Sequence, residues 1–531
     1  MFQILQVIIV ILYVAAMLGV GYFYMRRTKS VGDFFLGGRT LGPWMSAFAY
    51  GTTYFSAVLF IGYAGKLGWG FGIHTMWIVV GNTLIGTILA WKLLAGRTRD
   101  MTVRLNALTM PEFLRARYDS KGLQVVGAVV VFIFLVPYSA SVYMGLSYLF
   151  EKALGLQYNE ALFFLALLTG VYLVMGGYLA VALSDFIRGI VEFAGVMVMV
   201  FLLAHWKGGI AETTNRLLGD PNVMAPGLSR IIPLGPDQFQ IHVPGSLILI
   251  SLILITSFGP MALPQMVQKF YSIRSRADVA RAMTIAGVFA FFMTFGAYYS
   301  GALTHLYYDS GLPKEILSHG KPNLDQLMPH FITTQFPHGF VLLILLLVFS
   351  ASMSSLSSLV LVSSSAIAID VYGAFVNRHS NQKQTMALLR ILCAVFVALS
   401  LVLALNKVDV IVNLMVMSWG ALSGVFLAPY IYGLFWKKTT KAGAYAGVLT
   451  GLTSAFVLFS LWGKEGIPLA GAITMFLPMA VVPLVSLVTR PLPPAVVEAA
   501  FSDPRPAREE APVKTPGSPV APGTAITRGE T

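Results

Sequence analysis

The sequence predicts an all-α polytopic membrane protein. The chain has 531 residues, of which 56% are hydrophobic and 11% are charged. Apolar runs of about twenty residues, the length at which a helix crosses a bilayer, recur along most of the chain. Soluble domains do not combine this composition with such runs, so the soluble class is excluded.

Reading each long apolar run as one membrane span predicts about thirteen helices. The first run is followed, rather than preceded, by its positive charges, so we expect a retained anchor and not a cleaved signal peptide. The expected spans cover residues 3–24, 43–64, 70–94, 122–150, 158–177, 179–206, 246–268, 279–308, 339–370, 385–406, 408–436, 442–462 and 467–489.

Lysine and arginine gather in alternate loops. Clusters follow the first, third, seventh, ninth and eleventh spans, at residues 26–39, 97–121, 269–276, 378–383 and 437–441. The positive-inside bias therefore predicts a cell-membrane protein with its N-terminus outside and its C-terminus in the cytoplasm. The net charge of +13 reflects this topology, so nucleic acid is not an expected partner.

Two polar stretches interrupt the apolar pattern. Residues 207–245 are expected to form an extracellular loop with a short interfacial helix. Residues 491–531 contain nine prolines and are expected to form a disordered cytoplasmic tail. The single cysteine, Cys393, excludes a disulfide framework and a cysteine metal cluster. No catalytic motif lies at a common depth, so an enzyme is not expected.

Two spans contain signals for a break in the helix. The second has Tyr50-Gly51-Thr52-Thr53 at mid-depth, and the seventh has Gly259-Pro260 followed by Pro264. Backbone groups freed inside a membrane need protein or a polar cavity to satisfy them. Either break alone is also consistent with a kink that has no function. The starts of these two spans are five helices apart, which predicts two inverted repeats, 43–206 and 246–436.

The ninth span is rich in serine, with nine serines among residues 349–372. Ser350, Ser354, Ser357 and Ser358 share one helical face, with Ser355 at its edge. Such serines also let helices approach closely, and Ser363-Ser364-Ser365 are assigned to that role. The alternative is that hydroxyls and freed carbonyls replace the hydration shell of sodium.

Asp185 lies inside the sixth span, where an acidic residue is a functional candidate by default. Arg188 and Glu192 follow on the same helical face, so a salt-bridged structural role is also open. These two roles do not exclude each other.

Several stretches resemble the sodium/solute symporter family, which includes sodium/proline, sodium/pantothenate, sodium/sialic acid and sodium/sugar carriers. The resemblance covers essentially everything before residue 491. It implies a LeuT-type core of five plus five inverted helices, with one helix before the core and two after it. Its motifs are GDFFLGGRTLGPWMSAFAYGTTYFS, MGGYLAVALSD, ALPQMVQKF, FSASMSSLSS and SWGALSGVFLAPYIYGLFWKKTTKAGAYAGVLTG.

With this resemblance the chain divides into six expected regions. They are an N-terminal helix and cytoplasmic loop (1–42), the first repeat (43–206), an extracellular loop (207–245), the second repeat (246–436), two C-terminal helices (437–490) and the tail (491–531).

The resemblance implies one or two sodium ions held without a cysteine or histidine cage. The first site would use the carbonyls of Thr52, Phe55 and Ala351 and the hydroxyls of Ser354 and Ser355. The second would use Asp185 with Ser354, Ser357 and Ser358.

The solute is expected beside the two breaks, where a helix N-terminus and unpaired backbone groups can meet a carboxylate. Any single aromatic residue there is equally consistent with plain core packing. Proline carriers of the family have an acidic residue where this chain has Tyr54, and sugar carriers have a tyrosine near Pro260, so neither solute is singled out. The candidate residues are Tyr50, Thr53, Tyr54, Ser56, Tyr138, Ser257, Phe258, Gln265 and Trp419.

The implied function is secondary active transport. Sodium would drive symport of a small organic solute into the cell by alternating access, with one or two ions in each cycle. An amino acid such as proline, a monocarboxylate and pantothenate are the leading solutes. A proton-coupled carrier on the same fold and a solute sensor that does not transport are the alternatives. Beyond solute, sodium and the lipid bilayer, no obligate protein partner is expected.

Overall fold

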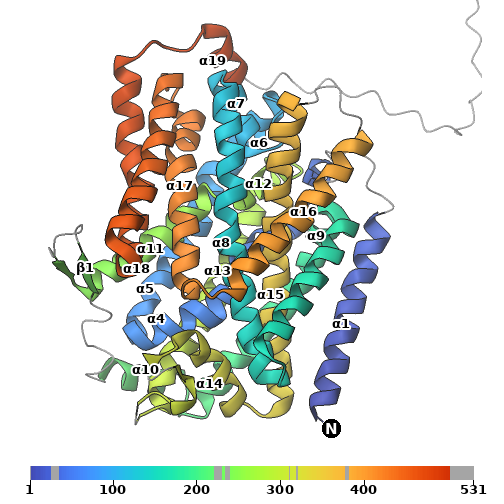
Figure 1. Ribbon diagram of the computed structural model, residues 1–531, viewed down its shortest axis with the longest axis vertical. Helices are drawn as coiled ribbons and strands as arrows, with labels where there is room; N and C mark the ends of the chain where they lie inside the picture. Colours follow the sequence, from blue (N-terminus) through green and yellow to red (C-terminus); the bar gives the residue numbers. More distant parts are fainter. Residues whose placement is uncertain are drawn as a thin grey trace, which may run out of the picture.

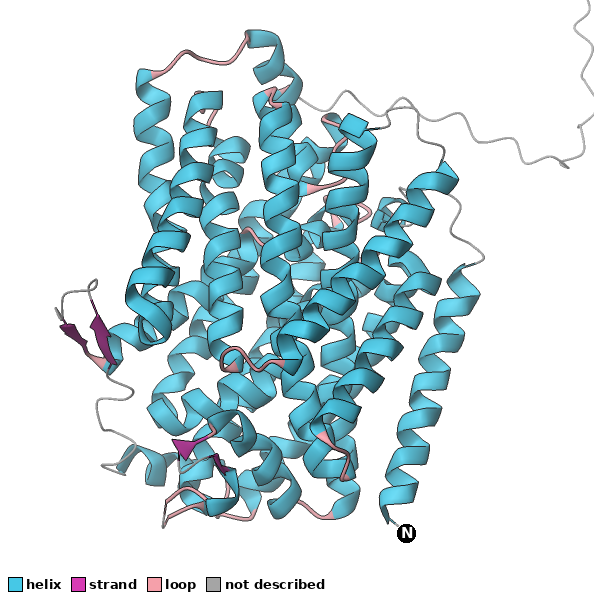
Figure 2. Ribbon diagram, in the orientation of Figure 1, coloured by secondary structure: helices cyan, strands magenta, loops and turns pink. Residues whose placement is uncertain are grey.

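A computed structural model describes residues 2–25, 35–219, 230–233, 240–309, 311–318, 321–376 and 382–502. Helices dominate the structure, and they run mostly along the long axis of the molecule (Figures 1 and 2). Two short antiparallel hairpins add the only strands among these residues. They are β1 (Arg230–Pro233) with β2 (Gln240–Val243), and β3 (Leu317–Ser318) with β4 (Lys321–Pro322).

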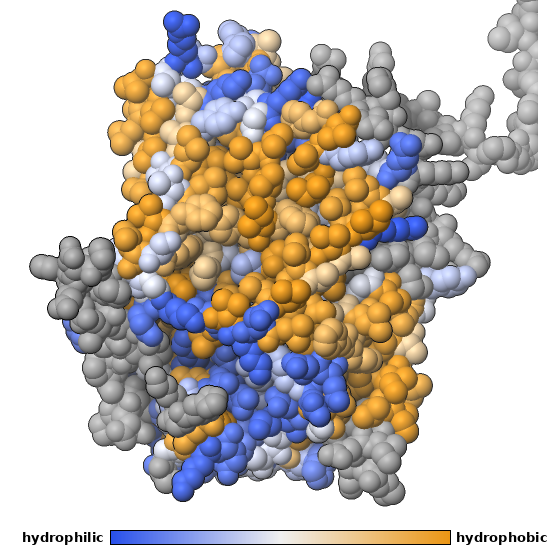
Figure 3. Space-filling view, viewed as in Figure 1, coloured by the Kyte–Doolittle hydropathy of each residue, from blue (hydrophilic) through white to orange (hydrophobic). Residues whose placement is uncertain are grey.

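The bundle has two ends that carry different elements (Figure 1). We call one end the α14 face, because α10 (Ile210–Gly219) and α14 (Leu327–Gln335) lie there. The opposite end is the α7 face, with α6 (Gly96–Arg104), α7 (Met110–Tyr118) and α19 (Pro494–Phe501). On the face shown in Figure 3, hydrophobic residues cover the upper middle and the lower right, and hydrophilic residues gather at the top and over the lower centre. This distribution fits a bilayer around the middle of the bundle.

Nine stretches of the described residues are long and apolar enough to cross a membrane, and Val7–Gly19 and Tyr158–Val171 are shorter apolar helices. The count of thirteen spans remains a prediction: Lys441–Val488 covers two expected spans, Val58–Arg104 covers one and the end of another, and the expected spans 3–24 and 158–177 contain only the two shorter helices. The nine are Val58–Arg104, Lys121–Leu154, Val181–His205, Gly245–Ser272, Asp278–Tyr307, His338–Val376, Gln384–Leu405, Ile411–Phe435 and Lys441–Val488.

Helix α9 (Tyr158–His205) begins and ends at the α14 face. The Tyr158 ring packs 5.0 Å from that of Tyr148, which lines a cavity there, and Tyr307 beside α14 donates its hydroxyl to the Leu203 carbonyl at 2.9 Å. The chain therefore runs inward and back within α9, as two expected spans require. Helix α18 (Lys441–Val488) is interrupted at Gly463, whose φ of 57° and ψ of −163° are not helical.

Other elements complete the bundle. The N-terminal α1 (Phe2–Met25) packs along α9. The central helices are α3 (Pro43–Tyr54), α8 (Lys121–Leu154), α11 (Gly245–Phe258), α12 (Pro264–Ser272), α13 (Asp278–Tyr307), α15 (His338–Ser365), α16 (Gln382–Leu405) and α17 (Ile411–Phe435). Between them lie α4 (Ala64–Phe71), α5 (Met76–Gly81) and shorter turns η1 (Gly37–Arg39), η2 (Val58–Tyr63), η3 (Gly72–Thr75), η4 (Asn82–Leu89), η5 (Trp91–Ala95), η6 (Gly259–Met261), η7 (Lys314–Ile316), η8 (Leu324–Gln326) and η9 (Ala366–Val376).

Glycine allows one especially close helix contact. A Cβ atom added at Gly301 in α13 would lie 2.0 Å from the carbonyl oxygen of Ala64 in α4, and one added at Gly68 would lie 2.3 Å from the Gly301 carbonyl carbon. The two backbones therefore touch directly. Small residues are the usual means by which membrane helices approach this closely.

The region expected to be a disordered tail begins with an ordered helix. Helix α19 covers Pro494–Phe501, and Arg104 donates to the Ser502 carbonyl at 2.9 Å. The guanidinium of Arg117 lies 5.0 Å from the Phe501 ring centre. Composition missed this helix, because no proline lies within it after its first residue, Pro494, a position where proline is tolerated. Residues 503–531 lie outside the described residues.

Candidate functional site

The first helix break lies later than the sequence predicts. Helix α3 continues through Gly51 and Thr52 and ends at Tyr54, and Phe55 is extended, with φ −110° and ψ 124°. The prediction at residues 50–53 is therefore wrong by a few positions. The glycine serves packing instead, because a Cβ atom at Gly51 would come within 2.4 Å of the Phe289 ring.

The second break lies where the prolines predict it. Helix α11 ends at Phe258, a short turn covers Gly259–Met261, and α12 begins at Pro264. Pro260 is the second residue of its turn and Pro264 is the first residue of α12, so the missing N–H of each removes no bond from within its own helix. The chain is extended at Leu263, so the axis of the span is interrupted inside the bundle.

The two breaks meet each other through a tyrosine. The Tyr54 hydroxyl, at the end of α3, donates to the Thr256 carbonyl near the end of α11. Ser257, the next residue, lies 3.5 Å from Asn82 between the Oγ and Oδ1 atoms. Both interrupted helices therefore border one central region.

The serine face of α15 turns toward the end of α3. The Ser355 hydroxyl donates to the carbonyls of Thr52, at 3.3 Å, and Thr53, at 3.1 Å. The Ser354 hydroxyl donates to the Thr52 hydroxyl at 2.8 Å. All of these groups are buried. Neutral oxygens from two helices thus converge, as the first sodium site requires.

The break leaves backbone groups of this region without helical partners. The N–H of Ala57, beyond the break, donates to the Ser352 hydroxyl at 3.2 Å instead of continuing the helical ladder of α3. Phe55 and Ala351, whose carbonyls the first site is expected to use, are both buried within this contact. A bound cation would find carbonyl and hydroxyl oxygens here and no charged side chain among the five predicted ligands.

The remaining serines of α15 have varied partners. Ser350 pairs with the Tyr13 hydroxyl of α1 at 2.6 Å, and Ser357 donates back to the Met353 carbonyl at 2.6 Å. Ser358 bonds the Thr53 hydroxyl at 3.0 Å. The face predicted as one ion-binding stripe is therefore shared among α1, α3 and the helix backbone.

Asp185 is fully buried beside α15. Its Oδ1 lies 3.6 Å from Nη1 of Arg188, an ion pair one helical turn away. The charge of Lys269 on α12 also acts on this carboxylate. The sequence groups Lys269 with the loop charges after the seventh span, but α12 continues through Ser272 and buries it completely. In the sequence, Lys269 directly follows an apolar run. A lysine in that position is equally typical of the start of a loop, so the sequence did not reveal its burial.

A small closed cavity lies between the two breaks and α17. The space open to the centres of water-sized spheres is about 20 Å³, roughly enough for one water molecule. Tyr54, Ser56 and Trp419 are the predicted solute residues that line it. The other lining residues are Phe55, Val58, Leu59, Tyr63, Asn82, Thr256, Tyr298 and Met415.

The other predicted solute residues lie around this cavity rather than on its wall. Tyr50 donates to the Gly86 carbonyl at 2.6 Å, and the Phe258 ring packs 5.2 Å from that of Phe476. Tyr138 packs edge-on against Trp419, with ring centres 5.7 Å apart.

Thr53 and Ser257 bond neighbouring side chains, as described above, and Gln265 is buried in α12. The sequence did not single out Tyr63, Asn82 or Tyr298. The hydroxyl of Tyr63 and the indole N–H of Trp419 bond no other described residue, so both are available to a polar solute.

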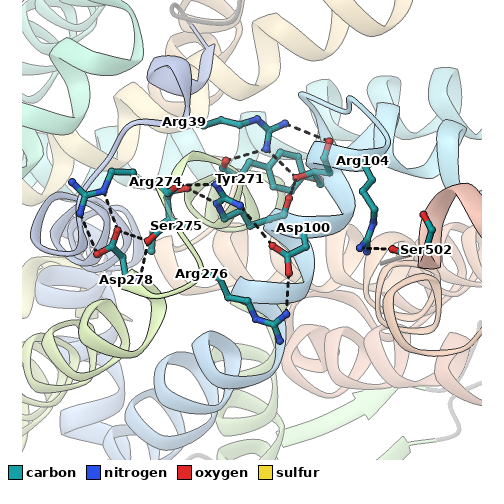
Figure 4. A network of polar contacts seen from close by, with 12 residues as sticks. Arg39, Asp100, Arg104, Tyr271, Arg274, Ser275, Arg276, Asp278 and Ser502 are labelled. Atoms are coloured by element: carbon teal, nitrogen blue, oxygen red, sulfur yellow. Dashed lines mark hydrogen bonds and ion pairs between the residues drawn. The ribbon is translucent and has the colours of Figure 1, made fainter. Parts of the chain in front are cut away.

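The two faces of the molecule differ around this centre. At the α14 face a cavity of about 520 Å³, measured in the same way, is lined by charged residues that include Lys66, Asp325 and Lys407. At the α7 face Arg39 donates to the carbonyls of Tyr271, at 3.1 Å, and Ala107, at 2.8 Å (Figure 4).

Further contacts extend this α7-face network. Arg99 donates to the Ile273 and Arg274 carbonyls at 3.0 and 2.6 Å, and Arg276 pairs with Asp100 at 3.1 Å (Figure 4). Arg39 follows Gly37 and Gly38, and all three have left-handed φ values of 59°, 63° and 59°. The glycine turn brings the guanidinium over the ends of α6 and α12.

An interrupted-helix site of neutral oxygens inside a membrane bundle defines the class of ion-coupled membrane transporters. Comparison with known proteins identifies the family. The model of the sodium:solute symporter family matches residues 34–451, and the chain belongs to this family. It is a sodium-coupled solute symporter of the multi-pass membrane type, and not an enzyme.

Curated relatives and solved structures agree with this assignment. The chain is 29% identical over 459 residues to the high-affinity proline transporter PutP of Bacillus subtilis (strain 168), covering 85% of this chain and 90% of the relative. It is 27% identical over 449 residues to the sodium/proline symporter of Escherichia coli (strain K12), covering 84% and 86%. A Na+-coupled sialic acid symporter in a substrate-bound outward-open state has the same LeuT-like fold, with a TM-score of 0.73, 19% identity and coverage of 92% and 98%.

Proposed function

We propose that this transporter imports proline or a closely related small amino acid with sodium, by alternating access. The observation that carries the sodium part is the contact of the Ser354 and Ser355 hydroxyls with Thr52 and the Thr53 carbonyl at the end of α3. The solute part is supported by relatives that are proline transporters and sodium/proline symporters.

The central cavity is the proposed solute site. Its wall combines Tyr54, Trp419 and other apolar surface with the polar groups of Ser56, Asn82 and Tyr63. A ring such as that of proline would pack on the aromatic side chains, and its carboxylate would meet the polar ends. Because the cavity is almost closed, binding requires it to expand, as alternating access implies.

One sodium ion is sufficient to drive accumulation. An inside-negative potential of about 100 mV contributes about 2.3 kcal/mol, and a tenfold sodium gradient about 1.4 kcal/mol. Together they support about 500-fold accumulation of a solute without net charge. Proline is a zwitterion at neutral pH, so a second ion is not needed to carry it inward.

The orientation and organisation are proposed on the same basis. The basic residues Arg39, Arg99 and Arg276 lie at the α7 face, which we propose is cytoplasmic. The N-terminus at the α14 face would then lie outside, in the cell membrane. The interrupted α3 and α11–α12 occupy matching places in the proposed repeats 43–206 and 246–436.

Uptake into liposomes tests the proposal. Purified protein should accumulate labelled proline when sodium is higher outside, and a proton gradient alone should not drive uptake. Pantothenate, monocarboxylates and sugars serve as competing solutes. Uptake that follows pH and ignores sodium would indicate the proton-coupled alternative, and binding without uptake would indicate a sensor.

A double variant tests the sodium site itself. Ser354→Ala with Ser355→Ala removes both hydroxyls that face α3, so we expect sodium-dependent uptake to fall at least about 100-fold. Ser363→Ala with Ser364→Ala is the matched control, because these serines are equally buried on the same helix but lie outside the site. Equal loss in both variants would contradict the assignment.

A further inference from the structure

Four charged side chains lie buried together in the middle of the bundle. Asp185, Arg188 and Glu192 come from α9, and Lys269 comes from α12. None of them is more than 1% exposed. Two are acidic and two are basic, so their formal charges cancel. Charged groups at this depth are costly unless they are paired. Asp185 and Arg188 form an ion pair at 3.6 Å, whereas the Glu192 carboxylate accepts no hydrogen bond from a described residue.

Lys269 occupies a specific place within this cluster. Its ammonium donates to the Ser358 hydroxyl at 3.0 Å, and Ser358 also bonds the Thr53 hydroxyl at 3.0 Å. Its positive charge also favours the ionised Asp185 carboxylate, as does that of Arg188, whose Nη1 lies 3.6 Å from Oδ1. The ammonium thus interacts with two of the groups expected to bind a second sodium ion, Asp185 and Ser358.

Ser357, a third residue expected to bind the second sodium ion, already has a hydrogen-bond partner. The Ser357 hydroxyl donates to the Met353 carbonyl of its own helix at 2.6 Å. A sodium ion at this place would have to displace the ammonium from Ser358 and would add a positive charge to a cluster that is already neutral. In a low dielectric, such an excess charge is strongly unfavourable.

The first sodium site has a different character. None of the five ligands expected there carries a charge, and among the described residues the Ser354 and Ser355 hydroxyls donate to Thr52 and Thr53, not to a charged side chain. A sodium ion can therefore enter between α3 and α15 without competing with a built-in cation. The main difference between the first and the second expected sodium site is that the chain places the positive charge of Lys269 in the second.

We propose that the Lys269 ammonium takes the place of the second sodium ion, so that this transporter binds and couples a single sodium ion per cycle. The inference rests on the proposed sodium-coupled function and deepens it. It also gives Asp185 a defined role, which is to position the ammonium against Ser358 rather than to coordinate an ion that moves with the solute.

Counting bound sodium tests this inference without any solute. Equilibrium binding of radioactive sodium to the purified full-length protein should give one ion per chain. Lys269→Gln leaves the cluster one positive charge short, so we expect a second ion, a twofold rise in stoichiometry. Lys269→Arg keeps the charge and should bind one ion.

Two further variants locate each ion. Lys269→Gln with Asp185→Asn removes one charge of each sign, so the count should return to one. Adding Ser355→Ala, which changes a hydroxyl expected only in the first site, should remove one ion from the wild-type protein and one from the Lys269→Gln protein. Thermal unfolding of each purified variant shows whether it is folded.

Each outcome decides the inference. Two ions bound by the wild-type protein overturn it, even if every lysine variant fails to fold. One ion bound by folded Lys269→Gln also overturns it. The inference is supported if the wild-type protein binds one ion and Lys269→Gln binds two. If Lys269→Gln is unfolded, the inference is supported when the wild-type protein and Lys269→Arg each bind one ion. One bound ion without proline uptake leaves it intact and changes only the proposed solute, whereas no bound sodium overturns both proposals.

Discussion

At the α14 face a wide cavity with a charged lining reaches into the molecule, whereas at the α7 face arginine side chains bridge the ends of neighbouring segments. The cavity measures about 520 Å³, while the central solute cavity measures about 20 Å³. The α7 face is joined by Arg39 and Arg99, which donate to backbone carbonyls that are distant in sequence.

One end of the molecule therefore holds a wide cavity, and side-chain hydrogen bonds join the segments at the other end. Hydrogen bonds from long, half-exposed side chains can be exchanged for bonds to water, so a seal made from them is reversible. Direct contact of two helix backbones has no such substitute. We therefore expect the α7 face to open during transport and the glycine contact near the α14 face to move as a rigid unit.

The largest expected effect comes from the rigid contact. Gly301→Ala places a Cβ atom 2.0 Å from the Ala64 carbonyl oxygen, where only backbone could give way. We expect a loss of more than about 4 kcal/mol of stability, seen as loss of folded protein in size-exclusion chromatography.

Gly170→Ala in α9 is the control for that change, because a Cβ atom there meets nothing within 4 Å. It should leave the folded yield unchanged. If Gly301→Ala folds as well as this control, the contact between α4 and α13 is not a rigid one.

The next largest effect concerns the seal. Arg39→Ala removes the bonds to the Tyr271 and Ala107 carbonyls, charged hydrogen bonds worth about 1.5–3 kcal/mol each. We expect the conformation with an open α7 face to become more stable, relative to the closed one, by about 3 kcal/mol. This change raises the ratio of open to closed molecules more than about a hundredfold. Val362 is buried and lines a pocket of about 10 Å³ together with Leu108 and Tyr271, close to the carbonyl that Arg39 reaches. A cysteine introduced as Val362→Cys, in a Cys393→Ser background, should therefore become reactive to maleimide in this variant.

Protection of the cysteine despite the loss of Arg39 would mean that the seal lies elsewhere. The outcome also bears on transport, since a protein that prefers the open α7 face should bind external sodium more weakly. That coupling follows from linkage between the two conformations.

The sequence was sufficient for the family and for most spans, and it failed where packing decides the structure. Proline made the break at Gly259–Met261 visible, because a missing N–H acts locally. Gly51 was misread as a break because the residue that requires it, Phe289, lies in another helix. No pattern within one span shows such a neighbour.

The residues of the candidate site likewise fall into those that the sequence could predict and those that it could not. Ser354 and Ser355 could be predicted because their spacing and the family motif both point to them, and the structure brings them to Thr52. Tyr63 and Asn82 could not, because single polar residues in apolar spans gain meaning only when the helices are assembled. Lys269 was visible but was assigned to a loop, since its burial depends on how far α12 extends.

A smaller effect is expected at the charged cavity of the α14 face. Burial raises the pKa of Asp325 to about 6, although the Ile411 N–H, at 3.0 Å from Oδ2, and the charge of Lys66 act in the opposite direction. The folded protein therefore holds this proton more tightly than the unfolded chain, whose carboxyl has a pKa of 3.8. The contribution of Asp325 to stability accordingly falls as pH rises from about 4 to about 6.

Asp325→Asn should remove that pH dependence. The amide oxygen can still accept the Ile411 N–H, and no charge is buried above pH 6, so the variant should be more stable than the wild-type protein by at most about 3 kcal/mol there. Thermal unfolding in detergent between pH 4 and pH 7 measures the difference. Parallel curves for the two proteins would show that the Asp325 carboxylate is compensated by its surroundings at the α14 face.

The smallest effect is expected from the outermost ion pair of the α7 face. Arg276 pairs with Asp100 at 3.1 Å, but its side chain is 71% exposed (Figure 4). Exposed pairs are worth about 0.2–1 kcal/mol, because water and salt screen them. Arg276→Ala should therefore leave maleimide labelling of Val362→Cys within about twofold of the parent, in contrast to Arg39→Ala. Similar opening by both variants would mean that the face is held by its total charge, and not by the two backbone carbonyls that Arg39 reaches.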